Sequence, residues 1–398
     1  MTEGIGRRNR RCGWTKGALT VISVASLIGS GAMSVPRARV FALPVVIVSL
    51  VAGLVGCGPS PAEGPPDATL YDHDAAAEPE RLSQSGLYAN TAAGVLADGV
   101  ELYAPRFELW SDGADKRRWI AVPDGERIDN ADADGWVFPE GTRLWKEFSS
   151  GGVKLETRLL YKQGPDPGDW YMMSYVWNDD ESDADAAPDG AEAVRGTEHA
   201  VPSQEDCVDC HEPTHDGALG FSPIQLDRDP AEADGELTLD DLRARGVLRY
   251  GTGTDGYPNY PLPGSASEQD VLGYLHGNCA GCHNPGSDVL GGVDTRPLFH
   301  IPTDEEARAS VDSLPAYEST LGVRTTETRG ATYHIDPGNP GDSAVYERMS
   351  TRDSDLAMPP LATDVVDEDA TAAVRAWIES LEAPGDGDAD GAGADGNQ

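Results

Sequence analysis

Two segments of the chain repeat one pattern of cysteine and histidine, C-x-x-C-H. The residues in this spacing are Cys207, Cys210 and His211 in the first copy and Cys279, Cys282 and His283 in the second. Haem c is held by two thioether bonds, which cysteine thiols form with the vinyl groups of the porphyrin. The histidine that follows supplies an axial ligand to the iron. The spacing therefore predicts two covalently attached haem c groups.

Zinc is the alternative cofactor, because paired C-x-x-C motifs also bind it. A zinc ribbon needs no histidine beside the second cysteine, and thiols that stay free are uncommon in exported proteins. The chain has six cysteines, and the two outside the motifs are Cys12 and Cys57. Both lie in a predicted leader, so no cysteine remains for a structural disulfide. This distribution favours haem over zinc.

The second motif has a candidate ligand for the opposite face of its iron. Met358 lies downstream in "DLAMPPLA", where Pro359 and Pro360 stiffen the loop. A thioether is a soft ligand that suits haem iron and raises its reduction potential. Met349 in "VYERMS" is the competing candidate, in a segment predicted to be a short helix, where methionine more often packs in a core. We therefore expect His283 and Met358 to bind the second iron.

The first motif has no such partner downstream, since no methionine lies between Met173 and Met349. The candidates for the other axial position of its iron are His199, His215, His276 and the pair Met172 and Met173. A lone histidine is more often an ordinary surface or core residue than a ligand. An iron with one open position is the remaining alternative, and it would bind or reduce a small ligand such as peroxide.

Residues 263–382 have the pattern of a helical domain. "SASEQDVLGYLHGNC" begins with a capping pattern, and "DEDATAAVRAWIESL" places Val374, Trp377, Ile378 and Leu381 on one helical face. A helix, C-x-x-C-H, a Met-Pro loop and a closing helix follow in the order seen in class I c-type cytochromes, which this region resembles. The stretch between His283 and Met358 is longer than in small cytochromes of this class, which implies an inserted loop around 288–335.

Residues 84–200 are predicted to form β-strands. "VKLETRLLYK" and "DWYMMSYVW" suggest a hairpin, and several shorter strand-like runs lie between Gly, Pro and Asp clusters. Such spacing is typical of a β-sandwich or small barrel. Six of the eight tryptophans lie here, and they are expected either to pack in the core or to form an aromatic surface facing a haem or a sugar. They are Trp110, Trp119, Trp136, Trp145, Trp170 and Trp177.

Residues 1–57 have the pattern of a leader with a bacterial lipoprotein signal peptide. The apolar run 40–56 follows Arg37 and Arg39 and ends in "LVGC", which resembles a lipobox. The resemblance implies cleavage before Cys57 and a lipid on its sulfur, with Met33 as a credible true start. A pair of membrane helices is the alternative, although both apolar runs are shorter than the ~20 residues that a span needs.

The remaining segments connect these parts. Residues 58–83 are predicted to be a disordered tether, 201–262 the first haem-binding segment, and 383–398 a disordered acidic tail. Together the segments predict a multi-domain α+β protein, with an N-terminal β-sandwich-like domain (84–200) followed by a mostly α-helical cytochrome c domain (263–382).

The chain is strongly acidic, with a formal net charge of −38. Such a charge argues against binding to nucleic acid or to anionic lipid surfaces. It is explained by solubility or adaptation to high salt, or by electrostatic steering of a basic redox partner.

The wider pattern "YAPRFELWSDGADKRRWIAVPDGERID", "CVDCH" and "YLHGNCAGCHNPG" resembles a family of exported bacterial dihaem c-type cytochromes with an N-terminal β domain. The resemblance spans roughly residues 84–382. It implies two covalent haems and a place in a periplasmic or cell-surface redox chain, and it suggests an electron carrier rather than a catalyst. The alternatives are a peroxidase-like oxidoreductase acting at the first haem, and a haem-bearing module whose β domain binds a glycan or a partner protein.

Overall fold

The computed structural model describes residues 78–382, except 213, 251–258, 288–295, 327–329, 353–355 and 362. The predicted leader, lipidated Cys57 and acidic tail lie outside the described residues, as does the tether up to residue 77. The folded part begins before the predicted boundary at residue 84, because Leu82 is completely buried. Among the described residues, no helix is both long and apolar enough to cross a membrane.

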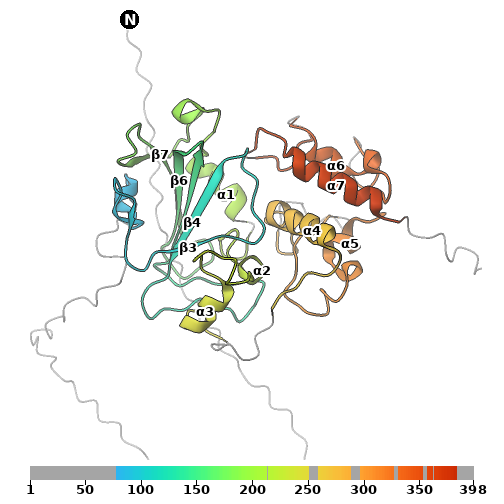
Figure 1. Ribbon diagram of the computed structural model, residues 1–398, viewed down its shortest axis with the longest axis horizontal. Coiled ribbons are helices and arrows are strands. Elements are labelled where there is room, and N and C mark those ends of the chain that lie inside the picture. Colours follow the sequence, from blue (N-terminus) through green and yellow to red (C-terminus); the bar gives the residue numbers. More distant parts are fainter. Residues whose placement is uncertain are drawn as a thin grey trace, which may run out of the picture. The chain divides into compact units, whose positions relative to one another are not determined.

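The centre of the β region is one antiparallel sheet in which six strands follow one another in chain order (Figure 1). The strands are β3 (Glu101–Tyr103), β4 (Asp115–Ala121), β5 (Arg143–Ser150), β6 (Val153–Lys162), β7 (Trp170–Trp177) and β8 (Ala184–Ala186). A separate pair consists of β1 (Tyr88–Asn90) and β2 (Val95–Leu96). The strands therefore form one large sheet and a small hairpin rather than the two facing sheets of the predicted sandwich-like domain.

A tight turn explains why consecutive long strands pair within the same sheet. Gly151 and Gly152 join β5 to β6 with positive φ angles of 57° and 82°, as in the two-residue turns that suit the twist of a hairpin. The predicted hairpin of 153–162 with 170–177 is confirmed as β6 and β7.

The two faces of the sheet bury different cores, because side chains alternate along each strand. Trp119, Trp145, Leu159 and Met173 lie opposite one another across β4–β7 and pack in a cluster on one face. Their neighbours point to the other face, where Ile120 and Leu144 join the largest core. Trp119, Trp145 and Trp177 are almost fully buried, which confirms core packing for these three tryptophans.

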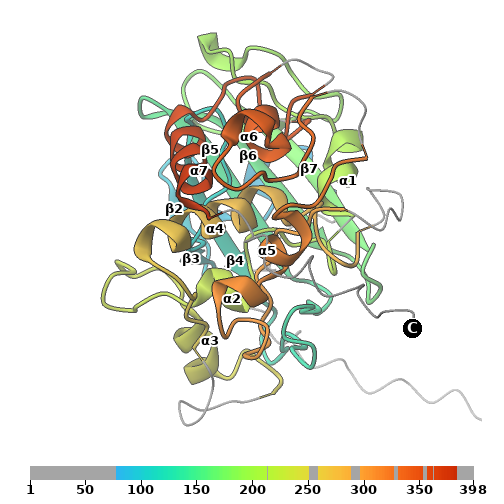
Figure 2. The ribbon, with the colours of Figure 1, turned by 90° about the vertical axis from the view of Figure 1, so that its right-hand side faces the viewer.

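The helices are mostly short. They are α1 (Gln204–His211), α2 (Pro223–Leu226), α3 (Leu239–Arg245), α4 (Ala266–Cys279), α5 (Pro315–Thr320), α6 (Ala344–Met349) and α7 (Glu368–Ser380). Single turns of 3₁₀ helix are η1 (Leu82–Gln84), η2 (Val194–Gly196), η3 (Val311–Ser313) and η4 (Pro340–Asp342). Figure 2 shows α4, α5, α6 and α7 gathered on one side of the sheet.

The two longest helices follow the sequence signals closely. Ser265 caps α4, and its side chain and that of Glu268 exchange hydrogen bonds with each other's backbone N–H. Helix α7 buries Val374, Trp377 and Ile378, and it packs against α4.

The sheet and the helices share one hydrophobic core. Residues of that core include Ile120 and Leu144 from the sheet and Leu275 and Trp377 from α4 and α7. The described residues belong to one compact unit, 63–398. The mixed α+β class is confirmed. A cytochrome c domain, as a more specific fold, remains a prediction.

Candidate functional site

The first C-x-x-C-H motif lies on α1. Ser203 caps this helix, and its hydroxyl accepts a hydrogen bond from the Asp206 N–H at 3.2 Å. Cys207 and Cys210 are three residues apart and therefore share one helical face, and His211 closes the last turn. The helix packs against β7, where Gln204 Nε2 donates to the Met172 carbonyl at 2.9 Å.

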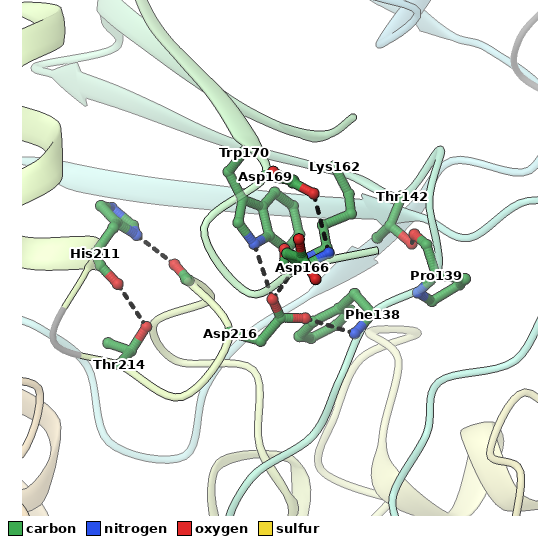
Figure 3. Close-up of polar contacts among 11 residues, drawn as sticks. Phe138, Pro139, Thr142, Lys162, Asp166, Asp169, Trp170, His211, Thr214 and Asp216 are labelled. Atoms are coloured by element: carbon green, nitrogen blue, oxygen red, sulfur yellow. Dashed lines mark hydrogen bonds and ion pairs between the residues drawn. The ribbon is translucent and has the colours of Figure 1, made fainter. Parts of the chain in front are cut away.

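The ring of His211 is held in one orientation. Its Nδ1–H donates to the carbonyl oxygen of Gly217 at 2.5 Å, and this leaves Nε2 as the nitrogen free to bind iron (Figure 3). Burial lowers the pKa of His211 to about 4. The imidazole is therefore neutral at pH 7, which is the form that binds metals.

A buried ion pair fixes the loop that carries this carbonyl group. Asp216 and Lys162 pair with side-chain exposures of 1% and 0%. Asp216 also accepts hydrogen bonds from the Phe138 N–H at 2.7 Å and from Trp170 Nε1 at 3.2 Å, and Lys162 donates to the Asp166 carbonyl at 2.8 Å (Figure 3). The carboxylate thus ties the loop after α1 to the end of β6 and the start of β7.

Gly217 itself meets two constraints that only glycine satisfies. Its φ angle is +71°, and a Cβ atom here would lie 2.8 Å from Trp170 Nε1. The loop can therefore pass close to the indole ring, and its carbonyl oxygen reaches His211.

The second motif continues from the end of α4 and repeats this arrangement. The His283 N–H donates to the Cys279 carbonyl at 2.8 Å, and His283 Nδ1–H donates to the Pro297 carbonyl at 3.1 Å. The ring of Phe299 lies edge-on at 5.3 Å from that of His283. Burial lowers the pKa of His283. Both motif histidines are thus neutral, and both leave Nε2 for a ligand.

Both candidate methionines line one small cavity with the second motif. The cavity has a volume of about 20 Å³, and its lining includes Cys279, Met349, Met358, Trp110 and Tyr274. The Met358 N–H donates to the Arg348 carbonyl at 3.0 Å, which ties the methionine loop to α6. The structure therefore brings both methionines to Cys279 but does not choose between them. A porphyrin needs far more space, so the side chains around the cavity must separate to admit one.

Trp110 reaches this cavity because α4 has glycines where the chain before β4 crosses it. A Cβ on Gly273 would lie 2.1 Å from the ring of Phe107, and one on Gly277 would lie 2.8 Å from the Phe107 carbonyl. The Trp110 N–H then donates to Asn278 Oδ1 at 2.7 Å. The sequence left open an aromatic surface facing a haem, and the structure places Trp110 beside the second motif.

The two motifs are neighbours in space although they are far apart in sequence. A Cβ on Gly281, within the second motif, would lie 3.1 Å from Cδ2 of Leu219, which follows the first motif. Burial raises the pKa of Cys282, and the charge of Cys210 raises it further. Thiols of the two motifs therefore lie within electrostatic reach of each other.

Each histidine considered for the first iron has another role. His199 Nε2 is 2.9 Å from Glu156 Oε1, and the ring of His215 lies against Gly135. His276 Nδ1 accepts the Ile301 N–H at 3.0 Å, so its own hydrogen is on Nε2, the nitrogen that would have to bind iron. Neither His199 nor His276 therefore presents a free Nε2 atom.

The two methionines of β7 point to opposite faces of the sheet. Met173 packs in the buried cluster with Trp119 and Trp145, away from α1. Met172 alternates with it and therefore points to the face over which α1 lies. Met172 is thus the methionine of this pair that remains a candidate.

Two polar networks of the site had no separate signal in the sequence. One is the Lys162–Asp216 pair. The other joins Glu156 to His199 and to Arg158, whose Nη2 lies 2.6 Å from Glu156 Oε1. The contacts of Lys162 with Asp216 and of Glu156 with His199 join distant segments, which residue spacing alone does not give.

The donor set fits covalent haem. All four cysteines of the motifs are free thiols, and each motif histidine has the hydrogen bond that directs Nε2 to a metal. Within the described ranges, no three His, Cys, Asp or Glu side chains converge as a metal site would require. A haem iron needs only one side chain on each face, since the porphyrin supplies four nitrogen ligands. Searches of protein-family models, curated proteins and solved structures found no match to this chain.

Proposed function

We propose that the protein is a dihaem c-type cytochrome that carries electrons in a redox chain. The observation that supports this most directly is the shared geometry of the two motifs. In both, Nδ1–H of the histidine donates to a backbone carbonyl, and two cysteines precede the ring at the spacing of haem attachment. The same hydrogen bond after the same cysteine spacing occurs in two separate segments. A purely structural role for the two histidines would not require this repetition.

In this proposal each motif has a defined role for its residues. Cys207 and Cys210 attach one haem and Cys279 and Cys282 the other, with His211 and His283 as axial ligands. When bound, haem supplies an iron that accepts and donates one electron. Met358 is the proposed second ligand at the second site, because it shares a cavity with Cys279 and is the less buried of the two methionines there.

The nearness of the motifs supports electron exchange between the two sites. A Cβ on Gly281 would lie 3.1 Å from Cδ2 of Leu219, so the segment that follows the first motif lies beside the second motif. We expect electrons to enter or leave through a partner protein, and the net charge of −38 favours a basic one.

The proposed location is the periplasmic side of a membrane or the cell surface. It follows from the lipobox-like "LVGC" at 54–57, through which Cys57 would carry a lipid anchor. The same acidic charge repels nucleic acid, so we propose no nucleic-acid partner.

Haem content tests the proposal directly. The full chain, produced with haem-attachment machinery and purified, should contain two covalently bound haems per polypeptide and show a Soret band. A protein that contained zinc and had no Soret band would contradict it.

Replacement of Met358 tests the ligand assignment. Met358→Ala should lower the reduction potential of one haem and convert it to a high-spin form, because a thioether ligand is lost. Ultraviolet–visible and EPR spectra together with a redox titration measure this. Met349→Ala is the matched control. It should cost about 2–5 kcal/mol of stability as a buried methionine and leave the ligation unchanged. The reverse pattern would assign Met349 as the ligand.

A second candidate function rests on the first site. His199 and His276 are both engaged by hydrogen bonds to other groups, which supports an iron with one open position that binds a small ligand such as peroxide, unless His215 or Met172 fills that position. A high-spin signal that responds to peroxide or cyanide at one haem would support this oxidoreductase. Two low-spin haems in both oxidation states would contradict it.

A further inference from the structure

One face of the sheet has a row of cationic side chains. Arg118 on β4 lies opposite Lys146 on β5, and Lys146 lies opposite Arg158 on β6. Residues paired in this way share a face, and like charges placed directly opposite are destabilising. Lys116, two residues before Arg118, extends the group. The concentration of four cations here is notable in a chain with 68 acidic residues and only 30 Lys and Arg.

Acidic side chains compensate the two ends of this row but not its centre. Glu108 lies 3.1 Å from Arg118 and 3.7 Å from Lys116, and Glu156 pairs with Arg158. Among the described residues, no carboxylate lies within ion-pair distance of Lys146. Its ammonium group lies instead 4.6 Å from the ring centroid of Phe148.

The electrostatic state of Lys146 reflects this imbalance. Burial lowers its pKa well below the usual value, and the charges of Arg118, Arg158 and Lys116 lower it further, while the charge of Glu156 opposes this shift. A buried cation among like charges is stabilised when an anion binds beside it.

The row begins beside the first C-x-x-C-H motif. Helix α1 lies against β7, and β6, β5 and β4 follow in order across the sheet. Arg158 and, more weakly, Lys146 act electrostatically on both Cys210 and His211. The row therefore leads away from the motif, with neighbouring strands about 4.8 Å apart.

We infer that Lys146, flanked by Arg118 and Arg158, is a carboxylate-binding site, and that the propionate groups of the haem attached at Cys207 and Cys210 occupy it. This inference rests on the proposed function. Haem attaches through its vinyl edge and has its two carboxylates on another edge, so a haem attached at α1 can extend over the sheet toward Lys146. The site gives the first haem an anchor in addition to its covalent bonds and His211.

The test compares Lys146→Gln with Arg117→Gln in the full-length holoprotein. Arg117 lies on β4, but it points to the opposite face and is exposed, so the control removes the same charge from the same sheet. Potentiometric titrations at several pH values measure the reduction potentials of both haems. The potential that changes in Met358→Ala is assigned to the second haem. Haem content is measured first, so that a failure of haem attachment is recognised as a failure of the proposed function.

Lys146→Gln should lower the potential of the first haem at pH 7, because a nearby cation favours the reduced state. The reduction potential of the first haem varies with pH as its propionates titrate. In Lys146→Gln the propionate pKa read from this dependence should rise by about 1–3 pH units, the range expected when an opposite charge is lost. Arg117→Gln should change neither. Identical pH profiles for the two variants, with both haems attached, would overturn the inference.

A titration with acetate distinguishes haem carboxylates from a free anion as the occupant. If the propionates occupy the site, added acetate at constant ionic strength should leave the wave of the first haem unchanged. A saturable shift with acetate that is lost in Lys146→Gln would show that the site serves free anions, and would overturn the assignment to haem.

Discussion

Asp216→Asn should lower the free energy of unfolding by about 3–5 kcal/mol, the cost of removing one partner from a buried ion pair. Lys162 has no exposed side-chain surface, so the variant leaves its charge in the protein interior without a carboxylate. The asparagine would also turn an amide donor toward a group that donates, since the Phe138 N–H and Trp170 Nε1 both point at the carboxylate. Denaturant unfolding followed by tryptophan fluorescence measures the change.

Two further variants separate the charge effect from a general weakness of the fold. Arg375→Gln breaks the exposed Arg375–Glu379 pair on α7 and should leave the unfolding midpoint nearly unchanged. Combining Lys162→Met with Asp216→Asn should recover part of the loss, because no buried charge then remains. The interpretation fails if Asp216→Asn costs no more than Arg375→Gln.

The same variant should alter the first haem site and leave the second one unchanged. Asp216 holds the loop whose Gly217 carbonyl accepts the His211 Nδ1–H, whereas His283 bonds to Pro297 in a separate loop. Spectra of native Asp216→Asn protein, recorded well below its unfolding midpoint, should therefore change at one haem only. A purely structural role for Asp216 predicts lower stability with no spectral change.

Local signals account for the parts of the fold that were predicted. The cap formed by Ser265 and Glu268 and the apolar face of α7 are properties of short segments, so the sequence indicates them directly. The alternation in β6 and the turn "GPDPG" that follows it likewise indicate the hairpin of β6 with β7. The C-x-x-C-H spacing is local too, which is why both motifs could be located without a structure.

The features that were missed depend on pairing between distant segments. Lys162 and Asp216 are 54 positions apart, and neither shows its partner in the sequence. The cationic row needs the register of three strands before Arg118, Lys146 and Arg158 become neighbours. Helix α1 was also missed. Its cap, Ser203 with Asp206, could have indicated it, but eight mostly polar residues give no apolar periodicity.

Removal of one cysteine pair should remove one haem and leave the other. Cys207→Ala with Cys210→Ala deletes both thiols on α1, and we expect haem content to fall from two per chain to one. The remaining haem should keep the spectrum assigned through Met358→Ala. The structural reason is that the second motif extends from α4, which packs with α7, whereas α1 lies against β7 and contributes no residue to the shared hydrophobic core. Pyridine haemochrome spectra and the intact mass measure the result.

The reciprocal variant, Cys279→Ala with Cys282→Ala, should have a larger effect on stability. Cys279 packs against the shared core, and burial raises the pKa of its thiol to about 12, so its surroundings are apolar. We therefore expect this variant to lose one haem and also to unfold more readily than the first one. Retention of two haems by either variant would contradict thioether attachment at that motif. Loss of both haems from Cys207→Ala/Cys210→Ala in a protein that still folds would show that haem must attach at the first motif before the second. We expect independent attachment instead, because the two motifs lie on helices that pack against different elements.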